Sequence, residues 1–154
     1  MKLLTNIIKI LLAVMMGLIT IITSYQIIMR FVFNNASTWS EELVRFIFVW
    51  ACFIAAGFGI REHAHVGIDV LVNKLPPKLH RIATIIVYLA IATFGGYLLY
   101  GSQGLLKSTG MQTSSVLHVP MSVLYSSILA LGGLCIFFSL YEIYLILKPQ
   151  KMEE

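Results

Sequence analysis

The chain alternates between four long runs of apolar residues and short polar segments. The first run covers residues 10–29 without a charged residue, the third lies between residues 81 and 107, and the fourth covers residues 121–147. A helix needs roughly 20 apolar residues to cross a hydrocarbon core of about 30 Å. These three runs are long enough to be membrane-spanning helices, so the pattern predicts an all-α integral membrane protein.

The second run, residues 46–60, is too short to span a membrane by itself, because its 15 residues give only about 22 Å of helix. Its helix must therefore begin in the polar segment before it. There Thr38-Trp39-Ser40-Glu41 matches the capping box, in which a hydroxyl and a carboxylate satisfy free backbone N–H groups. We therefore expect a single four-helix membrane domain over residues 1–154, with spans near residues 8–31, 39–61, 82–106 and 121–147.

The polar segment before the second span carries several charges. Glu41 and Glu42 fall in the first turn, where the helix dipole favours negative charge. Arg45 lies one turn farther on and can pair with Glu41 at i, i+4 or extend to the membrane surface. Trp39 is expected at the level of the lipid headgroups. We hypothesise that Arg30 joins these acids and Arg45 in an ion-pair network that fixes the first two helices; the alternative is local capping and pairing only.

A short amphipathic helix is expected between the second and third spans. Ile68, Leu71, Val72 and Leu75 recur at i, i+3, i+4 and i+7, which predicts a helix over about residues 67–75 lying flat on the membrane surface. The sequence KLPPK at residues 74–78 ends it, because two prolines cannot continue a helix.

Composition supports the membrane assignment and gives an orientation. Hydrophobic residues make up 58% of the chain and charged residues 12%, and the mean hydropathy is +0.87. A soluble fold could not cover its surface with so few polar groups, and the scattered basic residues do not indicate a nucleic-acid partner. Eight basic residues fall on the side of both termini and three on the other, which predicts cytoplasmic termini.

The middle of each predicted span lacks Asp, Glu, Lys, Arg and His. Proton relays and ion sites inside a membrane normally need such groups. Glu142 comes closest and is interpreted as a carboxylate at the membrane surface that pairs with a Lys or Arg. Gly95-Gly96 and Gly132-Gly133 have no flanking proline and are assigned to helix packing rather than to a broken transport helix.

Metal and haem sites are also not expected. His63 and His65, two residues apart on a helix, point in different directions, and only Asp69 stands near them. The four histidines all lie outside the predicted spans, which argues against a membrane haem and a cytochrome anchor. The two cysteines, Cys52 and Cys135, are interpreted as small buried hydrophobic residues. No catalytic residue, cofactor or metal is therefore assigned.

Residues 26–77 contain three short motifs and a stop. A Q-x-x-x-R-[FY]-x-[FL]-N pattern ends the first helix, W-[ST]-E-E-x-x-R opens the second, and R-x-x-x-H-[VI]-x-x-D and a leucine-proline stop follow. The residues at these positions are Gln26, Arg30, Phe31, Asn34, Trp39, Ser40, Glu41, Glu42, Arg45, Arg61, His65, Asp69, Leu75 and Pro76. This region resembles the small membrane subunit of tripartite ATP-independent periplasmic (TRAP) transporters. The order and spacing of these short motifs are more specific than any one of them.

The resemblance implies a subunit of the bacterial inner membrane that serves as scaffold and anchor, with membrane lipids around it. Its partners would be a large multi-span membrane subunit that couples transport to sodium and a periplasmic protein that delivers an organic acid. That acid would be a C4-dicarboxylate, a keto acid or a sialic acid. The alternative is a self-sufficient exporter formed by two four-helix chains, which would need a carboxylate in its first helix; residues 10–29 contain none.

Overall fold

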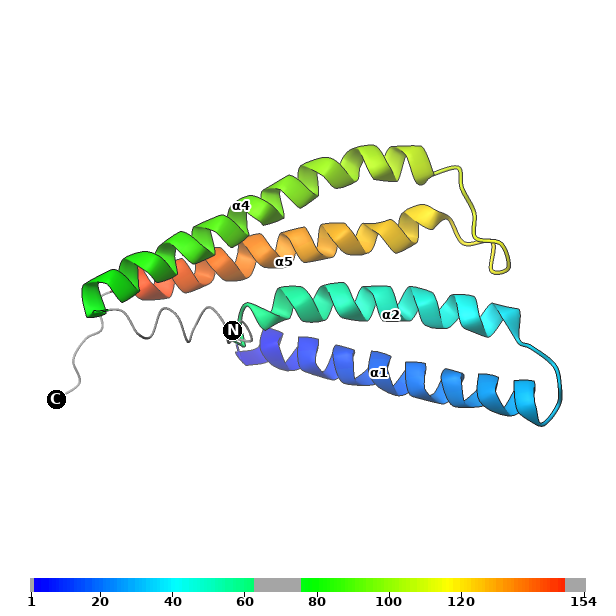
Figure 1. Ribbon diagram of the computed structural model, residues 1–154. Coiled ribbons are helices and arrows are strands. Elements are labelled where there is room, and N and C mark those ends of the chain that lie inside the picture. The colour runs from blue at the N-terminus through cyan, green and yellow to red at the C-terminus, as the bar shows by residue number, and fades with distance from the viewer. Residues whose placement is uncertain (1, 63–75, 149–154) are drawn as a thin grey trace.

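The computed structural model describes residues 2–62 and 76–148, and these residues form four long helices (Figure 1). Each helix is long and apolar enough to cross a membrane, which confirms the all-α class with four long apolar helices. The helix expected at residues 67–75 lies outside the described residues, as do His63, His65 and Asp69. The described helices are α1 (Lys2–Phe31), α2 (Thr38–Gly59), α4 (Pro77–Thr109) and α5 (Met121–Leu147).

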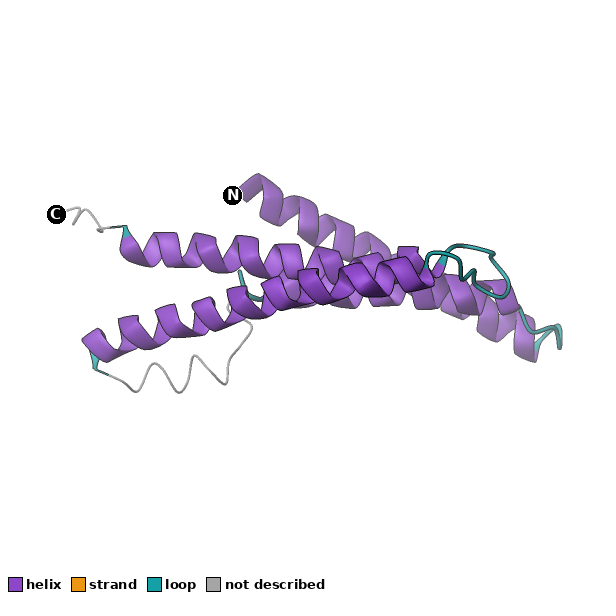
Figure 2. Cartoon of the chain, turned by 90° about the horizontal axis from the view of Figure 1, so that it is seen from above, coloured by secondary structure: helices purple, strands orange, loops and turns teal. Residues whose placement is uncertain are grey.

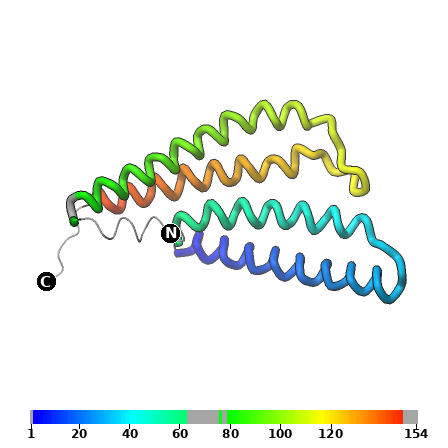
Figure 3. The backbone as a smooth tube through the Cα atoms, viewed as in Figure 1, coloured from blue at the N-terminus to red at the C-terminus, as the bar shows by residue number. Residues whose placement is uncertain are grey.

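The four helices lie side by side in the order α1, α2, α5, α4 (Figure 1). Within the described ranges, α1 packs only on α2, and α4 packs only on α5. These residues therefore form two helical hairpins, α1–α2 and α4–α5, which contact each other through α2 and α5. The view from above shows that the helices cross and spread apart toward one end (Figure 2). The α1–α2 and α4–α5 loops lie at one end of the row, and the start of α1 and the end of α5 lie at the other (Figure 3).

The start of α2 differs from the predicted capping box. The N-cap residue is Ser37, which makes no side-chain capping bond, and Thr38 is already helical. Glu41 is consequently one position too far along the helix for the reciprocal bond that a capping box requires. The Ser40 hydroxyl, fully buried, donates instead to the Ser37 carbonyl oxygen at 2.8 Å. The predicted capping box was therefore wrong, although the predicted starting point of the helix was correct to one residue.

The turn between α1 and α2 depends on Asn34. This residue has a φ of +49°, in the left-handed region that asparagine tolerates better than most residues other than glycine. The reversal lets the Asn35 N–H donate to the Met29 carbonyl oxygen at 3.0 Å, which satisfies a carbonyl at the end of α1. An asparagine at this position is thus explained by backbone conformation.

Two glycines set the distance between α4 and α5. A Cβ atom added to Gly132 would lie 2.9 Å from the Gly95 carbonyl oxygen, and one added to Gly95 would lie 2.9 Å from the Gly132 carbonyl oxygen. The backbones therefore touch, as small residues allow in membrane helices. This confirms the packing role of these two residues, whereas Gly96 and Gly133 face open space.

Candidate functional site

The two hairpins meet along what we call the α2–α5 interface, where these helices run in the same direction. Near the loop end the Trp50 indole N–H donates to the Val123 carbonyl oxygen at 3.1 Å. Farther along, the α carbon of Gly57 lies so close to α5 that an added Cβ would be 2.7 Å from the Leu134 Cβ. Polar contacts are present at both ends of this interface: those of Glu42 at the loop end and the Arg61–Glu142 ion pair at the other end.

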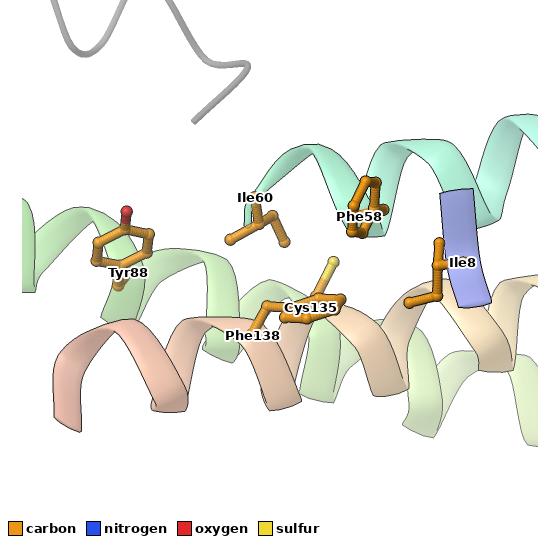
Figure 4. Close-up of a cluster of buried hydrophobic side chains, with 6 residues drawn as sticks. All are labelled: Ile8, Phe58, Ile60, Tyr88, Cys135 and Phe138. Carbon is orange, nitrogen blue, oxygen red and sulfur yellow. The ribbon is translucent and has the colours of Figure 1, made fainter. Parts of the chain in front are cut away.

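A small apolar cluster packs around this interface near the start of α1 and the end of α2 (Figure 4). Phe58 and Ile60 of α2 and its C-cap approach Cys135 and Phe138 of α5, and the Phe58 and Phe138 ring centroids lie 6.1 Å apart in an edge-to-face arrangement. Such aromatic pairs add stabilisation beyond their buried area. The prediction that both cysteines are buried is confirmed for Cys135, a free thiol, and is wrong for Cys52, which is exposed on the surface of α2.

At the loop end, the Glu42 carboxylate holds the connection between α4 and α5. Its Oε2 atom accepts hydrogen bonds from the backbone N–H groups of Val116 at 3.1 Å and Leu117 at 2.7 Å. Bonds from backbone donors to a charged oxygen are stronger than neutral ones. Glu42 therefore links the start of α2 to a loop more than 70 residues later.

The loop that Glu42 holds is itself ordered by hydrogen bonds. The Ser114 N–H donates to the Val119 carbonyl oxygen at 2.9 Å, and the Met121 N–H donates to the Gln112 carbonyl oxygen at 2.8 Å. The Val119 N–H donates to the Ser114 hydroxyl at 3.1 Å. The loop presents two adjacent N–H groups to one carboxylate because its own backbone bonds fix its shape.

At the other end, Arg61 and Glu142 form an ion pair between the end of α2 and α5. The Arg61 guanidinium donates to Glu142 Oε1, and the Glu142 side chain is only 7% exposed. The guanidinium also lies 5.4 Å from the centroid of the Tyr141 ring, a distance suited to a cation–π contact. The interpretation of Glu142 as a carboxylate paired with a basic residue is thus confirmed, and its partner is Arg61.

A second ion pair joins α1 to the end of α2. Lys9 Nζ lies 3.0 Å from Glu62 Oε2, and both side chains are about half exposed. The same ammonium group lies 5.8 Å from the centroid of the Phe58 ring. Exposed pairs of this kind contribute little to stability, so the Arg61–Glu142 pair is the more important of the two.

The remaining signature residues are not drawn into a charged network. Within residues 2–62 and 76–148 the ion pairs are Arg61–Glu142 and Lys9–Glu62, so Arg30, Glu41 and Arg45 form none there. Trp39 is partly exposed, and its ring centroid lies 6.1 Å from that of Tyr25 on α1. Glu42 also belongs to neither of these ion pairs and instead accepts hydrogen bonds from the loop between α4 and α5.

Two contacts were not anticipated from the sequence. The hydrogen bond from Trp50 to Val123 joins residues 73 positions apart. The sequence predicts only that a packed indole N–H usually finds some acceptor, and it does not indicate which one. Arg81 Nη2 donates to the Ile146 carbonyl oxygen at 2.9 Å, which ties the start of α4 to the end of α5. Neither contact has a local sequence pattern.

The arrangement defines a class of protein before any relative is considered: a polytopic helical membrane protein in which polar side chains hold helices together. Within the described residues, three or more His, Cys, Asp or Glu side chains nowhere gather closely enough to hold a metal ion. A family model described as "Tripartite ATP-independent periplasmic transporters, DctQ component" matches residues 19–148. The chain belongs to this family, which comprises transporter subunits rather than enzymes.

Curated relatives carry names that agree with this family. The chain is 36% identical over 92 residues to the C4-dicarboxylate TRAP transporter small permease protein DctQ of Vibrio cholerae, and 29% identical over 103 residues to the sialic acid small permease protein SiaQ of the same organism. These alignments cover 60% and 66% of this chain, and 40% and 60% of those proteins. The chain thus spans less than two thirds of the length of either relative.

A third relative is much longer. The isethionate TRAP transporter permease protein DctMQ of Oleidesulfovibrio alaskensis is 32% identical over 123 residues, which is 75% of this chain and 19% of that protein. In this relative the matching region is therefore part of a far larger permease polypeptide.

The Glu42 contact gives a testable difference between two neighbouring acids. We expect Glu42→Ala to lower the midpoint temperature of unfolding, because it leaves two loop N–H groups without their charged acceptor. Thermal unfolding in detergent, followed by circular dichroism, measures the change. Glu41→Ala is the matched control, since Glu41 is exposed and forms no ion pair among the described residues. Equal losses from the two substitutions would contradict the assignment of Glu42.

Proposed function

We propose that this chain is the small, non-conducting membrane subunit of a transporter that imports an organic acid into a bacterial cell. The subunit serves as scaffold and anchor for a large membrane subunit, which moves the solute and couples it to sodium. A periplasmic binding protein delivers the solute. The names of the relatives support substrates of the C4-dicarboxylate or sialic acid class.

The observation that carries this proposal is the chemistry of the four spans. Residues 10–29, 46–60, 82–106 and 121–141 contain no Asp, Glu, Lys, Arg or His. The carboxylate nearest to a span's interior, Glu142, is held by Arg61. Ion-coupled transport requires ionisable or ion-coordinating groups within the membrane, and these spans supply none that is ionisable and free.

The hydroxyl groups of α1 support the same conclusion. The Thr20 hydroxyl donates to the Met16 carbonyl oxygen at 2.9 Å, and the Ser24 hydroxyl donates to the Thr20 carbonyl oxygen at 2.8 Å. Because each bonds to its own helix, as Ser and Thr commonly do, neither donor is directed toward a solute. A polar path along α1 is therefore not formed by these side chains.

The arrangement of the helices also suits a scaffold. A row in which α1 contacts only α2 encloses no central space among the described helices, whereas a solute pathway needs surrounding walls. The longer DctMQ relative supports a large membrane subunit as the partner, because one polypeptide there contains this region and much more. The excess of basic residues in the segments that flank the start of α1 and the end of α5 supports an orientation with that end in the cytoplasm, beside the inner membrane.

Reconstitution tests the proposal directly. We expect liposomes that contain this chain alone to show no sodium-driven accumulation of a C4-dicarboxylate or a sialic acid. Liposomes that also contain the large subunit, with the binding protein added outside, should accumulate one of these acids. The large subunit without this chain is the control, and it should be inactive or unstable. Accumulation by this chain alone would overturn the proposal.

A further inference from the structure

A shallow groove runs along α4 on a surface that no described helix covers. It is almost entirely apolar and is lined by Ile85, Ile86, Leu89, Ala90 and Thr93. Thr93 does not make it polar, because its hydroxyl donates to the Leu89 carbonyl oxygen at 2.8 Å. The groove therefore offers a surface for a hydrocarbon chain.

A cation stands at the end of this groove. Arg81 precedes Ile85, the first residue of the groove, by four residues, so it lies about one helical turn before the groove and only about 40° farther around α4. Helical side chains lean toward the helix N-terminus, which directs the Arg81 guanidinium away from the groove and toward the aqueous end of the molecule. The groove and the cation are thus in line.

The length of the groove matches one leaflet of a membrane. From Ile85 to Thr93 the helix rises about 12 Å, and from Arg81 to Thr93 about 18 Å. Half of a hydrocarbon core is about 15 Å. An acyl chain that lies along the groove would therefore place its headgroup at the level of Arg81.

The charges at this end favour an anionic headgroup. Its two described acids, Glu62 and Glu142, are each paired with a base. Arg81 and Lys148 belong to neither of these pairs, and both side chains are exposed. Arg81 uses one N–H group on the Ile146 carbonyl oxygen, two residues before Lys148, so the two cations lie near each other at the ends of α4 and α5. A guanidinium has five N–H donors, and the others remain available to a phosphate.

We propose that the groove on α4, together with Arg81 and Lys148, binds one anionic phospholipid. One acyl chain lies along Ile85, Leu89 and Thr93, and the phosphate contacts Arg81. The bound lipid would fasten the start of α4 to the end of α5 from outside the helix pair. This site does not depend on the proposed transport role, because it uses neither a solute nor the large subunit.

Native mass spectrometry tests the lipid site. The full chain is purified in mild detergent, given equal amounts of phosphatidylglycerol and phosphatidylcholine, and analysed for retained lipid. We expect the wild type to retain one phosphatidylglycerol in preference to phosphatidylcholine. Arg81→Gln should reduce that preference roughly fivefold, the effect of one basic residue near an anionic surface. Arg81→Lys should keep most of it. Lys107→Gln, which removes an exposed base at the opposite end of α4, is the matched control.

A second substitution tests the acyl chain separately. Leu89→Trp fills the groove without changing its charge and should abolish retention of the lipid. Tyr100→Trp, at a position 80% exposed and outside the groove, should not. Circular dichroism of every variant checks that the helices still form.

Three results would overturn the proposal. One is equal loss with Arg81→Gln and Lys107→Gln, which would indicate general attraction of basic residues to anionic lipid. Another is unchanged retention in Arg81→Gln or Leu89→Trp. The third is a combination of two results: the wild type retains no lipid, and Leu89→Trp prevents co-purification with the large subunit. That combination would assign the groove to a partner protein.

Discussion

Gly132→Val is expected to separate α4 from α5 and to destabilise the protein by about 2 kcal/mol or more. A side chain at this position meets the Gly95 carbonyl oxygen at 2.9 Å and two carbon atoms of Leu99 at 3.0 Å. Backbone cannot move aside as the end of a flexible side chain can, and overpacking of this kind typically costs about 1–3 kcal/mol. The measurement is thermal unfolding in detergent, followed by circular dichroism.

Gly133→Val supplies the control for this prediction. An added Cβ there meets nothing within 4 Å, although the residue is next to Gly132 and has the same change in helix propensity. Gly96→Val is the corresponding control for Gly95→Val on the facing helix. If Gly133→Val destabilises the protein as much as Gly132→Val does, the loss of stability in Gly132→Val does not come from the close contact between the backbones of α4 and α5.

Glu142→Ala is expected to cost about 3–5 kcal/mol of stability. It leaves the Arg61 guanidinium, with a side chain only 28% exposed, without its carboxylate, and loss of one partner of a buried ion pair has an effect of this size. Replacing both residues, as in Arg61→Met with Glu142→Leu, should recover most of the loss, because no unpaired charge remains. Denaturation in detergent of Arg61→Met, Glu142→Leu and the double variant, each compared with the wild type, gives the coupling energy between the two positions.

The exposed ion pair on the same end of the molecule provides the comparison. Lys9→Ala and Glu62→Ala should each cost less than about 1 kcal/mol, because water screens both charges. A coupling energy near zero for Arg61 and Glu142, or losses at Lys9 as large as those at Glu142, would show that burial of the pair does not set its contribution.

The number and extent of the helices could be predicted from the sequence because lipid imposes a simple requirement on length and polarity. The second span illustrates this: its 15 uncharged residues were too few, so its start had to lie near Thr38, where the structure places it. The capping pattern failed there because several hydroxyl residues stand close together. A shift of one residue moved Glu41 out of reach of the bond it was assigned.

For the contacts of the candidate site, the sequence predicts the type of interaction but not the residue that takes part in it. Glu142 had to pair with some basic residue, because a free charge near the hydrocarbon is costly. That the partner is Arg61, 81 positions earlier, depends on the packing of α2 beside α5. Glu42 was expected to serve its own helix or a nearby arginine, and it bonds instead to a distant loop. Likewise, the sequence does not distinguish Gly132 from Gly133, which only the rotation of α5 separates.

The described helices of the two hairpins contact each other only through the α2–α5 interface, which has a consequence for biogenesis. Each hairpin contains two adjacent spans that pack on each other, so each can enter the bilayer and form before the other is present. Docking of the two hairpins would then bring Glu42 to the later loop and Arg61 to Glu142, one contact at each end of the α2–α5 interface. A substitution that disrupts the α2–α5 interface would therefore leave two helical hairpins that are inserted but have not docked. Quality control in the cell would then act on a membrane-embedded species rather than on an unfolded one.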